Sequence, residues 1–135
     1  MSQENVETFK RFVDAFNCRD AEAMVEVVDA GVEWRPAAPV ALGGEATVYR
    51  GHPGISEGLR DLHDSFAEVQ IEVSEFREVG DRVVGTGRIR TRGRGSGAEF
   101  DSIFGAVIEF KDGKATRIRS YLDPGEALEA ARLRE

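Results

Sequence analysis

The stretch Ser102–Leu133, SIFGAVIEFKDGKATRIRSYLDPGEALEAARL, decides the fold because it contains two long strands, a tight turn and a final helix. Asp112-Gly113 supplies the positive φ angles of a two-residue hairpin, so the strands on either side of it pair with each other. Pro124 stops the second strand and can start a helix. Asp123 and Glu126 match a capping box for that helix. We therefore expect the rest of the chain to pack against this hairpin or to pair with it.

Three helical patterns precede the strands. The first has a buried stripe at three- and four-residue spacing, formed by Val6, Phe9, Phe12, Val13 and Phe16. The second follows Asp20, which can cap it, and ends at Gly31. The third begins near Pro53. Between the last two, residues 32–35 alternate as a short strand, and residues 36–48 are predicted to be a loop that covers a pocket.

From Val69 onward the apolar residues recur with period two, which predicts strands. Gly80-Asp81 and the glycine-rich segment 93–97 are the turns between them. Helices come first and strands follow, so the predicted class is α+β, with three N-terminal helices on one curved antiparallel sheet. The whole chain, residues 1–135, is expected to form a single domain.

The segment from Phe100 to Phe110 has apolar residues at both odd and even positions. Phe104 and Ile108 share one parity, whereas Ile103 and Val107 share the other. A sheet with one solvated face should alternate more cleanly than this. Because three helices can cover only one face, we predict a homodimer that packs through the other face of the sheet.

Composition excludes several partners and sites. The chain has 135 residues and a formal net charge of −7, which argues against nucleic acid as a partner and against an anionic membrane surface. It has one cysteine and two histidines without a cluster at ligand spacing, so neither a metal nor another cofactor is expected. No apolar run is long enough to cross a bilayer, and we expect a cytoplasmic protein.

The order of motifs resembles that of the SnoaL-like proteins, which belong to the nuclear-transport-factor-two-like superfamily with ketosteroid isomerase, limonene epoxide hydrolase and scytalone dehydratase. The resemblance covers Phe9 to about Ala131. It rests on these motifs in order: Val-Glu-Trp at 32–34, Tyr-x-Gly-x-x-Gly-Ile at 49–55, Gly-Asp-Arg-Val-Val at 80–84, Gly-Arg-Gly-Ser-Gly at 93–97, Phe-x-Asp-Gly-Lys at 110–114 and Tyr-x-Asp-x-x-Glu-Ala-Leu at 121–128. It implies a cone-shaped α+β barrel that encloses a pocket for a small apolar or aromatic ligand, commonly in a homodimer.

The resemblance also implies an aspartate that acts as general acid or base at the pocket floor, and Asp123 and Asp101 are the candidates. A base that works near neutral pH needs a raised pKa, whereas a helix cap lowers the pKa of its carboxylate. The two roles of Asp123 therefore predict opposite shifts of its pKa, and the cap is the favoured role. Asp101 lies across a hairpin from several arginines, so a surface ion pair is favoured over an Arg–Asp pair in the pocket.

Five further residues are predicted to contact the ligand. They are Trp34 as an apolar wall, Tyr49 and Tyr121 as hydroxyl donors, His63 on the rim of the cavity, and Arg88 as the partner of Asp101. Ketosteroid isomerase activity is disfavoured because the first helix offers phenylalanines where a pocket tyrosine is expected.

Two functional hypotheses follow from these patterns. The first is a small-molecule-binding protein that can act as a cofactor-independent isomerase, cyclase or hydrolase through aspartate acid–base chemistry. The second is a non-catalytic dimeric module that senses a ligand or binds another protein. A carboxylate that faces a closed cavity would favour the first hypothesis.

Overall fold

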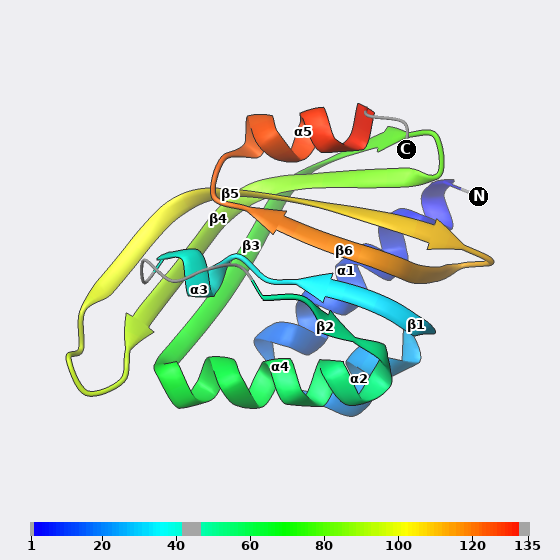
Figure 1. Cartoon of the computed structure of the whole chain (residues 1–135). Coiled ribbons are helices and arrows are strands. Elements are labelled where there is room, and N and C mark those ends of the chain that lie inside the picture. Colours follow the sequence, from blue (N-terminus) through cyan, green and yellow to red (C-terminus); the bar gives the residue numbers. More distant parts are fainter. Residues whose placement is uncertain (1, 42–46, 133–135) are drawn as a thin grey trace.

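A computed structural model describes residues 2–41 and 47–132, and Figure 1 shows how the elements are arranged. Within these residues six strands form one sheet in the order β2-β1-β6-β5-β4-β3. The strands are β1 (Val28–Arg35), β2 (Tyr49–Arg50), β3 (Phe66–Val79), β4 (Arg82–Gly93), β5 (Glu99–Lys111) and β6 (Lys114–Tyr121). The helices are α1 (Ser2–Asn17), α2 (Ala21–Glu26), α3 (Ala38–Ala41), α4 (Gly51–Ser65) and α5 (Pro124–Arg132). The predicted α+β class is confirmed.

The hairpin of β5 and β6 forms as predicted. Asp112 and Gly113 have φ angles of 55° and 79°, the left-handed values that a two-residue hairpin turn requires. Antiparallel pairing continues from β5 to β4 and from β4 to β3. On the other side β6 pairs with β1 in parallel, and β1 pairs with the short strand β2. The hairpin therefore occupies the middle of the sheet.

The inner face of the curved sheet is covered by α1 and α4 (Figure 1). Along α1 the three phenylalanines of the predicted stripe are buried, with Phe9 only 2% exposed, and its two valines are partly buried. Helix α4 contacts β1 and β2 near one edge of the sheet and β3 at the other edge. Because one helix spans both edges, it closes the open side of the curve, and the interior is enclosed as a cone.

Helix α5 lies on the opposite, outer face of the sheet (Figure 1). It forms a second core cluster of Val84, Val107, Ala127, Ala130 and Ala131. Gly105 permits this packing, since a Cβ atom there would lie 2.9 Å from the Cβ of Ala127. The premise that helices cover only one face is therefore wrong, and Val107 is buried within the chain. Ile103 stays 51% exposed, and the homodimer remains a prediction.

Two local predictions need correction. The second helix ends at Glu26, because the carbonyl of Val27 accepts a hydrogen bond from the Ala115 amide at 3.0 Å and the chain joins the sheet there. The predicted loop over 36–48 contains α3, and β2 follows it. Residues 42–46 of that loop lie outside the described residues.

Two absences hold for the described ranges 2–41 and 47–132. No helix there has both the length and the apolar character needed to span a bilayer. No three His, Cys, Asp or Glu side chains in those ranges come together in a way that could hold a metal ion.

Candidate functional site

An apolar cavity, called here the inner cavity, lies between α1 and the inner face of the sheet. Helix α1 contributes residues three and four positions apart, and each strand contributes alternate residues, because these are the positions that face inward. The lining residues are Phe9, Phe12, Val13, Phe16, Trp34, Pro36, Ala37, Ala38, Ile71, Ile89, Phe104, Ala106, Ile108, Ile118 and Ser120. Side chains from α1, from segment 36–38 and from the strands therefore line the same cavity.

Trp34 is the largest side chain in this lining. It is 2% exposed, and its ring meets the rings of Phe12 and Phe16 edge-on, with centroids 6.0 and 6.1 Å apart. Gly58 of α4 packs directly on it, since a Cβ there would lie 2.6 Å from Cζ3 of Trp34. Edge-to-face aromatic pairs contribute about 0.5–1.5 kcal/mol each beyond burial. The indole is thus held in one position by two helices.

The inner cavity is small. The space that can hold the centre of a water-sized sphere is about 30 Å³. A single water needs on the order of 10–15 Å³ by such a measure, and a cavity of about 150 Å³ is enough for benzene. The inner cavity therefore has room for one or two waters, and a ligand with several carbon atoms has to displace part of the lining.

Polar groups are scarce in the lining. Ser120 is the one hydroxyl-bearing residue among the described lining residues. It is half-buried on β6 and lies two positions after Ile118, so both side chains share the inner face. A ligand in this space would be recognised mainly by its apolar shape, with one hydroxyl able to donate or accept a hydrogen bond.

Asp123 lies at the start of α5, outside the inner cavity. Its carboxylate accepts a hydrogen bond from the Gly125 amide at 2.9 Å, and its carbonyl accepts one from the Glu126 amide at 3.0 Å. The side chain is exposed on the outer side of the sheet. The predicted helix cap is confirmed, whereas the catalytic role of Asp123 remains a prediction.

Asp101 lies on the outer face of β5. Its carboxylate accepts a hydrogen bond from Nε of Arg88 at 3.0 Å, and Nε of Arg90 lies 3.9 Å away. About half of the Asp101 and Arg88 side-chain surface is exposed, at 47% and 54%. The cross-strand ion pair predicted for these residues is confirmed. Neither side chain lines the inner cavity, so the structure does not bring Asp101 and Asp123 together there.

Tyr49 is buried beside the inner cavity without lining it. Its hydroxyl donates to Asp61 at 2.8 Å, and burial, reinforced by this hydrogen bond, raises the pKa of Tyr49 to about 12. Its ring centroid is 5.9 Å from that of Trp34. In the structure Tyr49 is therefore a neutral donor that supports the Trp34 wall.

His63 and Tyr121 also lie away from the lining. Both ring nitrogens of His63 are buried without a hydrogen-bond partner, and burial lowers the pKa of His63, with help from Arg19 and Arg94. Tyr121 is half-buried on the outer face, where the guanidinium of Arg35 stacks 4.7 Å from its ring centre. Of the seven predicted site residues, Trp34 alone lines the inner cavity.

The sequence analysis does not place Ser120 in the site, whereas residues 36–38 belong to the loop predicted over 36–48 to cover a pocket, and they line the inner cavity. Ser120 has the same parity as Ile118, so strand alternation could have placed it inside. The aromatic stripe of α1 was predicted as core, and it is both core and cavity wall. Residues 36–38 carry no periodic signal, so the sequence predicts a loop there without showing which of its residues face the cavity.

The sequence model described as SnoaL-like domain matches residues 9–118. An NTF2-like protein of unknown function from Burkholderia pseudomallei is 24% identical, has a TM-score of 0.77, and covers 96% of this chain and 98% of its own. TerC, co-crystallised with polyporic acid, is 28% identical, with a TM-score of 0.76 and coverage of 96% and 99%. An NTF2-like protein from Burkholderia xenovorans is 28% identical, with a TM-score of 0.73 and 97% coverage of both chains. No match is found among curated proteins.

Proposed function

Since this chain belongs to the SnoaL-like domain family, we propose that it binds a small apolar ligand in the inner cavity. The observation that carries the proposal is the lining itself, which brings aromatic and aliphatic side chains from α1 and from five strands around one space. Ligand pockets are mostly apolar and contain only a few polar groups that fix orientation. Ser120 is suited to that second role.

Binding requires the cavity to expand. A space of about 30 Å³ accepts one or two waters, whereas small-molecule pockets usually have several hundred Å³. The apparent affinity is therefore reduced by the fraction of molecules in which the lining has moved apart. Among the lining residues, Pro36, Ala37 and Ala38 lie beyond the end of β1 and are not held by strand pairing. We expect these residues to shift first when a ligand enters.

Polyporic acid is a rational first probe, because TerC was co-crystallised with it and resembles this chain over almost its whole length. Trp34 is the only tryptophan in the sequence and lines the cavity, so its fluorescence reports on occupancy. Calorimetry with the same compound measures the binding affinity independently, because light absorption by the ligand, which can reduce the fluorescence signal, does not affect it.

Replacement of either of two alanines by leucine tests the location of the site. Ala38 lines the cavity and is 2% exposed, whereas Ala30 is exposed on β1. We expect Ala38→Leu to fill the space and weaken binding about tenfold or more, and Ala30→Leu to leave binding unchanged. Equal binding by both variants, or no binding of apolar probes to the unaltered chain, contradicts the proposal.

Acid–base catalysis by Asp123 or Asp101 is a further proposal, and it needs more than the binding site described above. A general acid or base must come within hydrogen-bond reach of the reacting atom. Neither carboxylate lines the inner cavity, so binding without turnover is the function that the geometry supports best. Product formation that is lost in Asp123→Asn or Asp101→Asn, while ligand binding persists, would support catalysis.

The homodimer is proposed to form through the part of the outer face that α5 leaves uncovered. Ile103 lies there, 51% exposed. An exposed isoleucine beside solvated arginines is a small apolar contact, so its replacement by a charge should weaken the association. Light scattering of the unaltered chain and of Ile103→Lys at micromolar concentration tests this, and a monomer in the unaltered chain contradicts it.

A further inference from the structure

A second pocket, called here the outer pocket, lies on the other face of the sheet at the junction of β1 and β6. It has a volume of about 110 Å³ and is lined by Glu33, Arg35, Val48, Arg117, Ile118 and Arg119. Three of these six residues are arginines and only one is acidic. The outer pocket is thus small and cationic, whereas the inner cavity is apolar.

Two of the arginines are direct neighbours in the sheet. Arg35 of β1 and Arg119 of β6 are register partners in the parallel pair, so their side chains leave the same face side by side. Like charges at paired positions repel each other and destabilise a sheet. An arrangement of this type is stabilised when an anion lies between the two guanidinium groups.

Both arginines have a buried donor without an acceptor. Nε of Arg35 and Nε of Arg119 are buried, and neither has a hydrogen-bond partner among the described residues. The rest of each guanidinium is already fixed in place. Arg119 donates from Nη2 to Glu109 at 3.1 Å, and Arg35 stacks on the ring of Tyr121. The two Nε–H groups are therefore held in position without an acceptor among the residues that the structure describes.

The two arginines cannot remove their unpaired donors by losing a proton. His63 also has buried ring nitrogens without partners, but burial lowers its pKa, so this ring can be neutral. The guanidinium group stays charged in proteins. A buried, charged donor without a partner requires an acceptor from outside the chain, and an anionic acceptor also offsets the charge.

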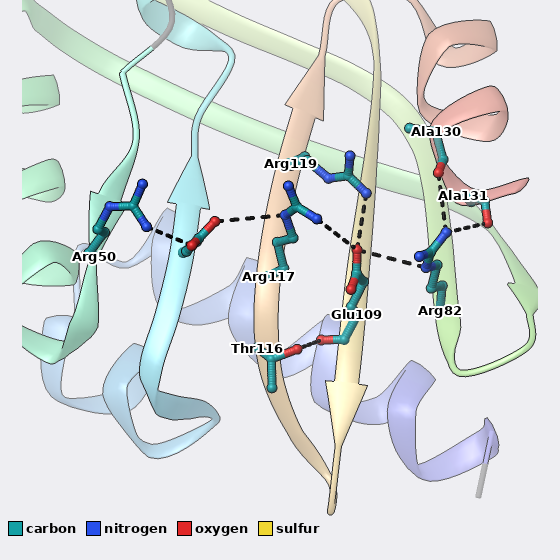
Figure 2. A network of polar contacts seen from close by, with 9 residues as sticks. Arg50, Arg82, Glu109, Thr116, Arg117, Arg119, Ala130 and Ala131 are labelled. Carbon is teal, nitrogen blue, oxygen red and sulfur yellow. Dashed lines mark hydrogen bonds and ion pairs between the residues drawn. The ribbon is translucent and has the colours of Figure 1, made fainter. Parts of the chain in front are cut away.

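Figure 2 shows the ion pairs around the outer pocket. They connect Arg50 and Arg117 to Glu33, and Arg82, Arg117 and Arg119 to Glu109. The described lining of the outer pocket itself has three arginines and one glutamate, which is two more positive than negative charges, in a chain whose formal net charge is −7.

We propose that the outer pocket binds a small oxyanion, a free phosphate or the carboxylate of a small acid, between Arg35 and Arg119. The anion accepts hydrogen bonds from the two Nε–H groups, and Arg117 adds charge at the rim. Planar guanidinium groups bind two oxygens of a phosphate or carboxylate in parallel, which matches the chemistry of this site. The inference goes beyond the proposed function, because the outer pocket lies on the opposite face of the sheet from the inner cavity.

Nuclear magnetic resonance of the arginine Nε–H groups tests the proposal directly. The intact chain is titrated with inorganic phosphate, with acetate and, at matched ionic strength, with chloride. We expect the Nε–H resonances of Arg35 and Arg119 to shift and saturate with phosphate, with acetate or with both, and not with chloride. Shifts that are equal in chloride, or no shift at tens of millimolar phosphate and acetate, overturn the proposal.

Variants identify the donors. Arg35→Gln and Arg119→Gln each remove one buried Nε–H, and we expect each to weaken binding of the anion about tenfold. Arg90→Gln is the matched control, since Arg90 lies on the same face at 66% exposure and loses the same charge. Binding that falls equally in the control would show a general charge effect and overturn the site. If either variant fails to fold, the titration of the unaltered chain still decides the question.

Discussion

Phe104 and Ile103 are consecutive residues of β5, yet their side chains have opposite surroundings. Phe104 is 2% exposed and lines the inner cavity, whereas Ile103 is 51% exposed on the outer face among arginines. The same alternation runs along β6, where Ile118 faces inward and Arg119 faces outward. One sheet therefore presents an apolar surface on one side and a largely charged surface on the other.

The contrast separates two tasks that a small domain has to perform. The inner face contributes most of the buried apolar area, which is the dominant favourable term in folding. The outer face is covered by α5 over only part of its area, and elsewhere ion pairs such as Arg88–Asp101 and Arg92–Glu68 are about half exposed. Solvated ion pairs contribute little to stability. The exposed charges of the outer face can therefore change without much loss of stability, unlike the more buried Glu109.

The largest expected effect is a difference in the free energy of unfolding between substitutions at two adjacent residues of β5, one on each face of the sheet. Phe104→Ala removes a buried ring and should lower the free energy of unfolding by about 3–5 kcal/mol. Ile103→Ala should change it by less than about 0.5 kcal/mol, because that side chain is half exposed. Urea unfolding of both variants gives the comparison.

Similar losses at the two positions would show that Ile103 is buried in solution, as the predicted homodimer requires. In that case the loss in Ile103→Ala should depend on protein concentration, since dissociation precedes unfolding. If Phe104→Ala does not fold, Phe104→Leu provides a milder version of the same test.

A smaller effect is expected from Glu109, the centre of the outer network. Its Oε2 lies 3.1 Å from Arg119 and 3.7 Å from both Arg82 and Arg117 (Figure 2). Glu109→Gln leaves three clustered arginines without their shared anion and should destabilise the fold by about 1–3 kcal/mol. We expect salt to reduce the loss, because it screens the remaining repulsion.

Glu99→Gln is the matched control for this substitution, since Glu99 lies on the same strand and is exposed. The same variant also sharpens the inference about the outer pocket. Removal of the acid that holds Arg119 should strengthen phosphate binding, and weaker binding in Glu109→Gln would count against an oxyanion site.

Much of the fold could be predicted because its signals are local. Asp112-Gly113 requires the left-handed turn that it adopts, and Asp123-Pro124 ends a strand and caps a helix in the same few residues. The buried face of α1 is predictable for the same reason. Residues three and four positions apart lie on one face of a helix, so the apolar stripe marks the face that packs inward.

Pairings between distant segments could not be predicted in this way. Nothing in the local pattern of residues 28–35 shows that they pair in parallel with β6, or that Arg35 is placed beside Arg119. The apolar residues of both parities on β5 predict a covered outer face, but the sequence does not show that α5 covers part of it, because the position of α5 depends on tertiary packing. Six of the seven predicted site residues lie outside the inner cavity for a related reason. Residue type indicates possible chemistry, but the direction of the side chain depends on the sheet.

Asp123 provides the next prediction, with an effect of about 1 kcal/mol. Asp123→Ala removes the acceptor of the Gly125 amide and should destabilise α5, whereas Asp123→Asn keeps a good cap and should change stability little. Hydrogen exchange in α5 reports the difference. A catalytic acid predicts another pattern, in which both variants lose turnover. The pair therefore separates the two roles that the sequence allowed for Asp123.

The smallest expected effect is a dependence of stability on pH at His63. Burial, followed by Arg19 and then Arg94, lowers the pKa of His63 from 6.5, although Asp64 opposes the shift. Between the lowered value and 6.5 the unfolded chain binds more protons than the folded chain. His63 thus contributes stability that is fully present above pH 6.5 and is lost as the pH falls through its folded pKa.

The test is urea unfolding of the unaltered chain and of His63→Gln from about pH 8 to about pH 5. We expect the difference in stability between the two proteins to be constant above pH 6.5 and to shrink or reverse below it. A constant difference over the whole range would mean that the ring nitrogens find acceptors in solution. His63 would then resemble Arg35 and Arg119, whose buried donors keep their charge and need an external partner. The outcome therefore decides whether His63 loses its charge and one of its two N–H donors in the folded chain, whereas the guanidinium groups on the outer face stay charged.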